Sequence, residues 1–299
     1  MIWILAFIII PTTVCHSSSP DSSPKIAVRD DTGYVLTLDK PALRVVPLYG
    51  AFADILFALD RGDAVVGRTN ADAHDPRLAS LPSVGTHMQP TSELIISLRP
   101  DAVLQMSGRR EASVLAESLR GAGIPVLVFN LDSFESLFSA TLALGALTGA
   151  PDRAKELANE WRERLKALPK IPGAPVTTFF EIRYPDLAAA GRTGIVNDII
   201  KAAGGENIIE IPGKIARINE EIVIERDPET YIYQKGPMNP APTDPGTRPY
   251  LRGSRAIRDG NILPVEERLF SRPGPGSIDA AEILAAFFAE VASNRKDGK

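Results

Sequence analysis

The chain has 299 residues, of which 44% are hydrophobic, and this is enough apolar material to form the core of one large or two medium domains. Its formal net charge of −4 at pH 7 does not favour general nucleic-acid binding. The only cysteine is Cys15, so the rest of the chain has no disulfide and no cysteine ligand for a metal.

The N-terminal segment is an apolar run followed by a stretch rich in Ser and Pro. Residues 2–14 are too short to cross a bilayer comfortably and are typical of the hydrophobic part of a secretory signal peptide. Residues 17–24 are typical of a linker. Cys15 is a candidate for lipidation, because a secreted lipoprotein begins at such a cysteine. We therefore expect residues 1–24 to be a signal peptide and linker, and the protein to be periplasmic or extracytoplasmic.

The next segment, residues 25–131, alternates between strand and helix patterns. It begins with extended chain at 25–47, which contains a turn at 31–33. Strands are predicted at 44–48, 64–67, 101–105 and 125–129, and helices at 50–60, 91–98 and 110–120. Strands that alternate with helices indicate a mostly parallel sheet covered on both faces. We interpret this segment as an N-terminal α/β lobe.

The longest helical pattern covers residues 132–168. Apolar residues recur every three or four positions on both sides of Pro151, and Asp132 with Glu135 has the spacing of a capping box. We expect Pro151 to kink the helix without ending it. At ~1.5 Å per residue the helix would be roughly 55 Å long, longer than a small domain is wide. Residues 132–169 are therefore predicted to be a backbone helix that belongs to two lobes.

The strand and helix rhythm returns in residues 170–299, which we interpret as a C-terminal α/β lobe. Strands are predicted at 176–182 and 230–233, and helices at 195–203, 219–224 and 278–292. Residues 236–250 form a loop rich in proline, and long loops of this kind are often functional.

A short repeated pattern lies on each side of the predicted backbone helix. Glu93 and Glu221 each follow a capping residue by two positions and precede a proline by seven, with an aliphatic run between. Each pattern predicts a short helix that stops before the proline and leads into a strand. Its presence on both sides indicates two similar lobes.

Motifs of common enzymes are missing from the sequence. It has no Gly-rich turn between a strand and a helix, no phosphate-binding Walker loop and no His-Glu-x-x-His. His74 and His87, with Asp72 and Asp75, could hold a metal directly, although such Asp residues are more often helix caps. We therefore expect no enzymatic activity, and the sequence does not identify the ligands of a metal.

Several blocks of the sequence resemble one family. They are AVRDDTGYVLTLDKPALRVVPL, the VG followed by TSELIISLRPDAVL, AAAGRTGIVNDIIKAAGGENI and FSRPGPGSIDAAEIL. The chain is similar to the periplasmic substrate-binding proteins of ABC importers for cobalamin, iron-siderophores and haem, from Lys25 to about Ala292. The resemblance implies two Rossmann-like lobes joined by a single long backbone α-helix, and a ligand cleft between them. It also implies that Glu93 and Glu221 dock into arginines of the membrane permease.

The ligand cleft is expected where loops follow the strands. The candidate ligand-binding residues in such loops are Tyr49, His87, Arg109, Arg183, Tyr184, Arg192, Arg248, Tyr250 and Arg272. Several arginines together with tyrosines favour an anionic metal chelate, because guanidinium groups pair with carboxylates and catecholates. Haem would require an axial Tyr or His, for which Tyr49, His87 or Tyr184 would serve.

The sequence therefore predicts a monomeric, extracytoplasmic solute-binding protein that delivers an iron-siderophore or similar metal chelate to an ABC permease. It needs no intrinsic cofactor and binds no nucleic acid. The first alternative is a corrinoid (cobalamin) or haem ligand on the same fold. The second alternative belongs to a different functional class, and it is a metal-dependent enzyme or redox subunit on a two-lobed scaffold.

Overall fold

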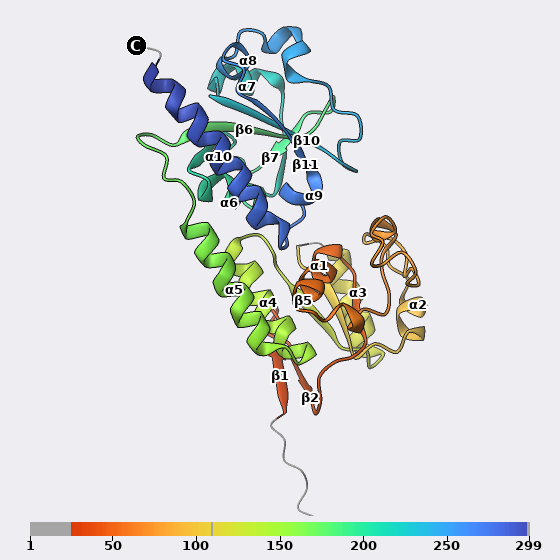
Figure 1. Cartoon of the computed structure of the whole chain (residues 1–299). Helices are drawn as coiled ribbons and strands as arrows, with labels where there is room; N and C mark the ends of the chain where they lie inside the picture. Colours follow the sequence, from red (N-terminus) through yellow and green to blue (C-terminus); the bar gives the residue numbers. More distant parts are fainter. Residues whose placement is uncertain (1–24, 109, 298–299) are drawn as a thin grey trace, which may run out of the picture.

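The strands of the computed structural model, which describes residues 25–108 and 110–297, form two separate larger sheets (Figure 1). One sheet is three-stranded with the order β3-β4-β5. The other is six-stranded with the order β11-β10-β6-β7-β9, and β8 also pairs with β6. We call the body around the first sheet the N-terminal lobe and the body around the second the C-terminal lobe. The predicted two-lobed α/β fold class is confirmed.

The N-terminal lobe follows the predicted order of strands and helices. Its strands are β1 (Ile26–Arg29), β2 (Val35–Leu38), β3 (Val45–Pro47), β4 (Ala102–Met106) and β5 (Val126–Phe129). Its helices are α1 (Gly50–Ala58), α2 (Ser92–Ser97) and α3 (Arg110–Gly121), with short 3-10 turns η1 (Gly62–Ala64) and η2 (Asn70–Asp72). The strand predicted at 64–67 was wrong, because only Val65 makes a bridge to Val45 there.

The side chains of the strands in this lobe point alternately to the two faces of the sheet, so the lobe has two separate hydrophobic clusters. Val45 and Leu104 face the core that continues toward the other lobe, whereas Val46 and Val103 face α2 and α3. Since neighbouring side chains of a strand point to opposite faces, a sheet buried on both faces needs apolar residues at every position. The continuous apolar runs in β3, β4 and β5 meet that need.

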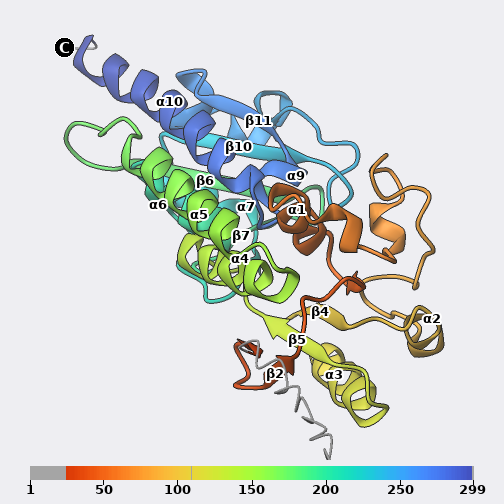
Figure 2. The same ribbon diagram turned by 60° about the horizontal axis from the view of Figure 1, so that its bottom comes forward.

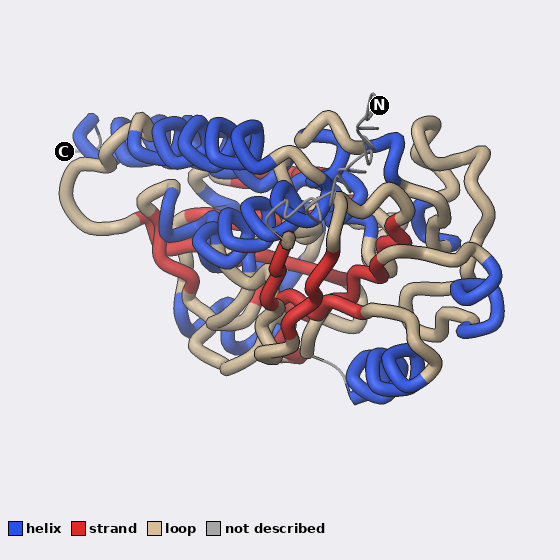
Figure 3. The backbone as a smooth tube through the Cα atoms, turned by 90° about the horizontal axis from the view of Figure 1, so that it is seen from below, coloured by secondary structure: helices blue, strands red, loops and turns tan. Residues whose placement is uncertain are grey.

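The C-terminal lobe contains more strands than the sequence predicted. Its strands are β6 (Val176–Arg183), β7 (Ala188–Ala190), β8 (Gly205–Asn207), β9 (Ile215–Arg217), β10 (Thr230–Lys235) and β11 (Ile262–Glu266). Its helices are α6 (Ile195–Ala202), α7 (Glu220–Arg226), α8 (Arg255–Arg258), α9 (Glu267–Phe270) and α10 (Gly276–Asp297), with 3-10 turns η3 (Pro245–Thr247) and η4 (Pro249–Leu251). β10 runs parallel to both β6 and β11, whereas β7 runs antiparallel to both β6 and β9. Figure 3 shows helices on both sides of the strands.

The prediction of one continuous backbone helix was wrong. The segment forms two helices, α4 (Phe134–Thr148) and α5 (Pro151–Lys166), which lie side by side as an antiparallel hairpin (Figure 2). Gly149 ends α4 with a φ of 78°, a left-handed conformation that favours glycine. Pro151 then starts α5 at a position where a missing N–H has no cost. Proline thus begins a second helix and does not kink the first.

Aromatic packing explains why the chain reverses at this point. The rings of Phe138 in α4 and Trp161 in α5 lie 6.2 Å apart between centroids. A Cβ atom on Gly145 would approach that of Ala154 to 2.3 Å, so glycine is what lets the two helices come this close. The apolar residues spaced three to four apart, which predicted one stripe along a single long helix, therefore lie on two helices. They pack these helices against each other and against the core.

The predicted capping box was displaced by one residue. Ser133 is the N-cap of α4, and its side chain and that of Ser136 each accept from the other's backbone N–H. Asp132 is therefore free of the helix cap and forms an ion pair with Lys214.

The helical hairpin connects the lobes. α4 packs on β1 and α1 of the N-terminal lobe, while α5 packs on α10 of the C-terminal lobe. Arg164 of α5 forms ion pairs with Asp279 and Glu282 of α10, at 2.6 and 2.7 Å. One hydrophobic cluster runs through both lobes and the hairpin. The domain limits predicted at residues 131 and 169 remain predictions.

Within residues 25–297, no described helix is both long and apolar enough to cross a membrane. The predicted signal peptide and linker, with Cys15, lie outside the described residues.

Candidate functional site

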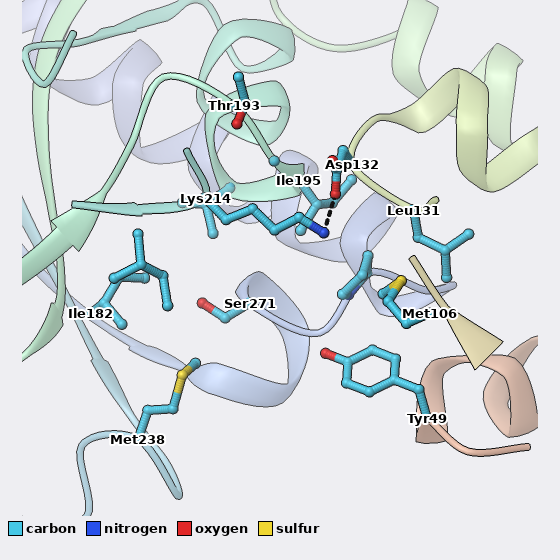
Figure 4. Close-up of a pocket in the computed structure, with 14 residues that line it drawn as sticks. Tyr49, Met106, Leu131, Asp132, Ile182, Thr193, Ile195, Lys214, Met238 and Ser271 are labelled. Atoms are coloured by element: carbon cyan, nitrogen blue, oxygen red, sulfur yellow. Dashed lines mark ion pairs between the residues drawn. The ribbon is translucent and has the colours of Figure 1, made fainter. Parts of the chain in front are cut away.

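A cavity of about 180 Å³ lies between the two lobes (Figure 4). From the N-terminal lobe it is lined by Tyr49, Met106 and Leu131, which follow or end the parallel strands β3, β4 and β5. Ile182 near the end of β6 and Met238 after β10 line it from the C-terminal lobe. The carboxyl ends of parallel strands are the usual place for ligands in α/β folds. The cavity therefore lies where the sequence predicted the ligand cleft.

The lining is mainly apolar, with two methionines and one tyrosine among aliphatic side chains. The polar side chains that line it are Asp132, Thr193, Lys214 and Ser271. Among the described residues, no arginine lines this cavity. A pocket of this composition fits a ligand with large apolar faces and few charged groups.

Asp132 and Lys214 form an ion pair at the wall of the cavity (Figure 4). Asp132 precedes α4, and Lys214 lies between Gly213, which has a φ of 111°, and the start of β9. Neither residue was predicted from the sequence to line the cleft. Asp132 has the spacing of a helix cap, and nothing local distinguishes Lys214 from other surface lysines, so only the fold brings the two charges together.

Tyr49 and His87 are two predicted ligand contacts whose rings the structure places near each other. Their ring centroids are 6.3 Å apart with an edge-on geometry. Tyr49 points into the cavity in Figure 4, and His87 lies in a loop whose ends are joined by a bridge between Gly85 and Pro90. Tyr49 is also the N-cap residue of α1 and makes no side-chain capping bond there. Tyrosine and histidine at one side of a cleft are suitable axial ligands for a bound metal macrocycle.

Arg248 lies inside the C-terminal lobe, away from the cavity. Its side chain is 3% exposed and forms a bidentate ion pair with Glu181, at 2.5 and 3.0 Å, and Glu181 is fully buried. Its guanidinium lies 3.7 Å above the ring of Tyr184. The Tyr231 hydroxyl donates to Glu181 at 2.6 Å, and burial, together with this carboxylate, raises the pKa of Tyr231 well above its usual value. The network is a satisfied buried ion pair that stabilises the lobe.

The other arginines predicted to contact ligand are also used elsewhere or exposed. Arg183 pairs with Asp186 at 2.6 Å, and Arg192 is exposed beside the cavity-lining Thr193. Arg272 pairs with Asp54 and Asp72 at the boundary between the lobes. Arg109 lies outside the described residues. The remaining candidate is Tyr250, which packs against the hydrophobic cluster of the C-terminal lobe that contains Phe179 and Tyr231. Its burial raises the pKa of its hydroxyl.

Glu93 and Glu221 are exposed in the first turns of α2 and α7, at equivalent places in the two lobes. Each helix stops before the predicted proline and is followed by a strand of its sheet, β4 or β10. The neighbouring Leu94 and Ile224 are large apolar side chains that are 45% and 48% exposed. Both carboxylates are accessible to a partner surface.

The alternative of a metal held directly by His74, His87, Asp72 and Asp75 is not supported. Within residues 25–108 and 110–297, no group of three or more His, Cys, Asp and Glu side chains is arranged to hold a metal. Asp72 and Asp75 are instead paired with Arg272 and Arg77.

Comparison with known proteins identifies the same family as the sequence motifs. The family model described as periplasmic binding protein matches residues 45–265. An uncharacterized ABC transporter substrate-binding lipoprotein of Bacillus subtilis is 25% identical over 268 residues, which are 87% of this chain and 84% of the relative. A cobalamin-binding protein of Halobacterium salinarum is 26% identical over 274 residues, which are 87% of this chain and 73% of the relative.

A solved structure extends the similarity to the fold. The periplasmic heme-binding protein of Pseudomonas aeruginosa is 26% identical, with a TM-score of 0.69, and the match covers 83% of this chain and 93% of that one. The family model covers well over half of the 299 residues, and the resemblance predicted from the sequence is confirmed. This chain belongs to the periplasmic binding protein family, whose members serve ABC importers outside the cytoplasm.

Proposed function

We propose that the chain captures a flat metal macrocycle, a porphyrin or a corrinoid, in the cavity between its lobes and delivers it to an ABC permease. The observation that carries this proposal is the lining of the cavity, where Tyr49, Met106 and Met238 lie among aliphatic side chains and no described arginine takes part. Apolar walls suit the faces of a macrocycle, and Tyr49 with His87 supplies groups that bind iron or cobalt.

The sequence favoured an iron-siderophore because several arginines were expected in the cleft. However, Arg248 is held by Glu181 inside the C-terminal lobe, and Arg272 is held by Asp54 and Asp72. Arg272 lines a second interlobe cavity of about 430 Å³ and not the apolar one. The names of the relatives include a cobalamin-binding protein, a heme-binding protein and an Fe3+-hydroxamate transport system, so they leave all three ligand classes open. A siderophore becomes one of the outcomes to be tested.

The cavity must widen to accept such a ligand. Its 180 Å³ is below the roughly 300–1,000 Å³ of typical small-molecule sites. In this proposal the lobes separate from the spacing of this structure, admit the macrocycle and hold it at a wider spacing. Binding and release are then movements of lobes, and catalysis has no part in them.

Docking and anchoring are the remaining parts of the proposal. Glu93 and Glu221 are exposed on both lobes, so each lobe offers one carboxylate to arginines of the permease. Lipidation at Cys15 would hold the protein at the membrane, as the name of the B. subtilis relative indicates for that protein. We expect the protein to act as a monomer.

Titration of the full chain with haemin, cyanocobalamin and ferrichrome tests the ligand class. We expect saturable binding of haemin or cyanocobalamin, seen as a shift in its visible spectrum, and none of ferrichrome. Tyr49→Ala should weaken the binding, whereas Tyr34→Ala, in the hairpin of β1 and β2, should not. Saturable binding of ferrichrome alone would contradict the proposed ligand.

A further inference from the structure

A cluster of six charged side chains joins the two lobes beside the ligand cavity. Both lobes contribute to this interlobe cluster, which consists of Asp54, Asp72, Asp75 and Arg77 from the N-terminal lobe and Arg268 and Arg272 from the C-terminal lobe. The N-terminal lobe alone would present three carboxylates to one guanidinium, and the two arginines from the other lobe balance the charge. The cluster is therefore complete only when the lobes are closed.

Arg272 is the central contact of the cluster. Its Nη2 lies 3.0 Å from Asp72 Oδ1 and its Nε lies 3.2 Å from Asp54 Oδ2. The side chain of Asp72 is only 3% exposed and also accepts the hydroxyl of Thr69 at 2.7 Å. Arg268 makes longer contacts of 3.3 and 3.4 Å and is 58% exposed. Partly buried pairs are screened by salt much less than exposed ones, so the bridge from Arg272 to Asp72 is the stronger of the two.

Gly50 leaves the space that this bridge occupies. A Cβ atom on Gly50 would lie 1.6 Å from Arg272 Nη2 and 2.0 Å from Asp72 Oδ1. Gly50 is the first residue of α1, where alanine would cost less conformational entropy. The φ of this residue lies outside the left-handed region that favours glycine. The close approach of the guanidinium from the other lobe is therefore the physical reason for glycine here.

Arg272 and Gly50, which leaves room for the bridge, each adjoin residues that line the cavity. Tyr49, which precedes Gly50, lines the cavity from the N-terminal lobe. Ser271 and Pro273, which flank Arg272, line it from the C-terminal lobe. The contact between Arg272 and Asp72, which passes beside Gly50, therefore joins the two lobes next to these walls.

We propose that Arg272 is a positioning residue that sets how far the lobes close, and that Gly50 is the glycine that permits this closure. Arg272 acts on the ligand through the spacing of Tyr49 and Ser271 and does not itself contact the ligand. The inference deepens the proposed function, because it says what holds the cleft at its closed width. It applies to any ligand that binds between the lobes.

The spacing of the lobes can be measured without a ligand. Spin labels are placed at Val114 and Asp259, exposed residues of the N- and C-terminal lobes, in full chain carrying Cys15→Ser. Distance distributions are then recorded for Arg272→Gln, Arg272→Lys and Gly50→Ala. We expect Arg272→Gln and Gly50→Ala to shift the balance from closed to open by roughly fivefold to thirtyfold, the effect of losing a partly buried ion pair. Arg272→Lys keeps the charge and should retain most of the closed population.

The double variant Gly50→Ala with Arg272→Gln separates this role from general damage. Both changes remove the same bridge, so the double variant should resemble Arg272→Gln alone and not add the two effects. The matched control is Arg295→Gln, which breaks ion pairs with Glu229 inside the C-terminal lobe and should leave the spacing unchanged. Thermal unfolding of each variant shows that it is folded.

Three results would overturn the proposal: unchanged spacing in Arg272→Gln, additive effects in the double variant, or the same widening in Arg295→Gln. Because no ligand is present, these results stand whether or not a macrocycle binds. Haemin and cyanocobalamin titrations of the same variants then complete the test. Because the cavity must widen before a macrocycle enters, a variant with a wider cleft should raise the association rate of whichever probe binds to the wild type. Failure of both probes to bind the wild type would contradict the ligand class alone.

Discussion

The carboxylate of Asp132 and the ammonium group of Lys214 meet at the wall of the ligand cavity, although the two residues belong to segments on either side of the helical hairpin. These two residues form an ion pair within a cavity lining that is otherwise uncharged and mainly apolar. A ligand that enters must either leave this pair intact or replace one of its partners. We therefore expect the pair to distinguish ligands that carry carboxylates from those that do not.

Replacing Lys214 tests this distinction. In Lys214→Met, we expect haemin to bind about tenfold more weakly, because a hydrogen bond to a charged group contributes roughly 1.5–3 kcal/mol and haemin carries carboxylates. Cyanocobalamin, which has amides in their place, should bind about as well as to the wild type. Parallel equilibrium titrations measure both affinities. Lys170→Met is the control, since Lys170 lies outside the cavity lining. An equal loss for both ligands would mean that Lys214 only shapes the cavity.

Removing Arg248 should destabilise the protein without removing a ligand contact. Arg248→Met leaves the buried carboxylate of Glu181 without its ionic partner, and breaking a buried pair in this way costs ~3–5 kcal/mol. Urea unfolding measures the loss. The double variant Arg248→Met with Glu181→Leu should lose less, because no unpaired charge remains. A stable single variant that no longer binds ligand would place Arg248 in the site, as the sequence predicted.

Reversing the charge of Glu93 and Glu221 should abolish transport and leave binding intact. Both carboxylates are exposed and lie outside the cavity lining, so Glu93→Lys with Glu221→Lys removes only the contact proposed for the permease. Uptake by cells and affinity of the purified protein are measured side by side. Glu111→Lys, another exposed glutamate in the first turn of a helix, is the matched control. Weakened ligand binding in the double variant would assign these residues to the site instead.

The contribution of the interlobe cluster to the stability of the folded state should decrease in acid. Side-chain hydrogen bonds from Arg77 outweigh the effect of burial and lower the pKa of Asp75 to about 2. An unfolded Asp has a pKa near 3.9, so the pair stabilises the folded state above about pH 4 and its contribution is lost as the pH falls toward 2.

The expected contribution of Asp75 at neutral pH is up to about 2 kcal/mol. Unfolding free energies of the wild type and of Asp75→Asn should therefore differ most above pH 4 and converge toward pH 2. Asp186→Asn is the control, because Asp186 belongs to an exposed pair whose contribution is small. A difference between the wild type and Asp75→Asn that does not change with pH would mean that Asp75 is not held ionised by Arg77.

Local patterns in the sequence were sufficient for the order of strands and helices in the N-terminal lobe, because that order depends on apolar spacing, capping residues and prolines within a few positions. The place of Tyr49 at the cavity was also predictable, since residues that follow a parallel strand lie at the edge of the sheet where ligands bind, but its contact with a ligand stays a prediction. The short strands β7, β8 and β9 were missed because they have three residues each and exist only through their partners.

The sequence by itself determined the family, the two α/β lobes and the place of the cleft, because these follow from short-range spacing and recognisable blocks. Only the tertiary structure decided that the helix reverses at Gly149, where Gly145 and Ala154 come into contact. It also decided which charges line the cavity. An arginine in a loop has the same local signature whether it contacts ligand, pairs with Glu181 or bridges two lobes, because its partner lies tens of residues away and is chosen by the fold.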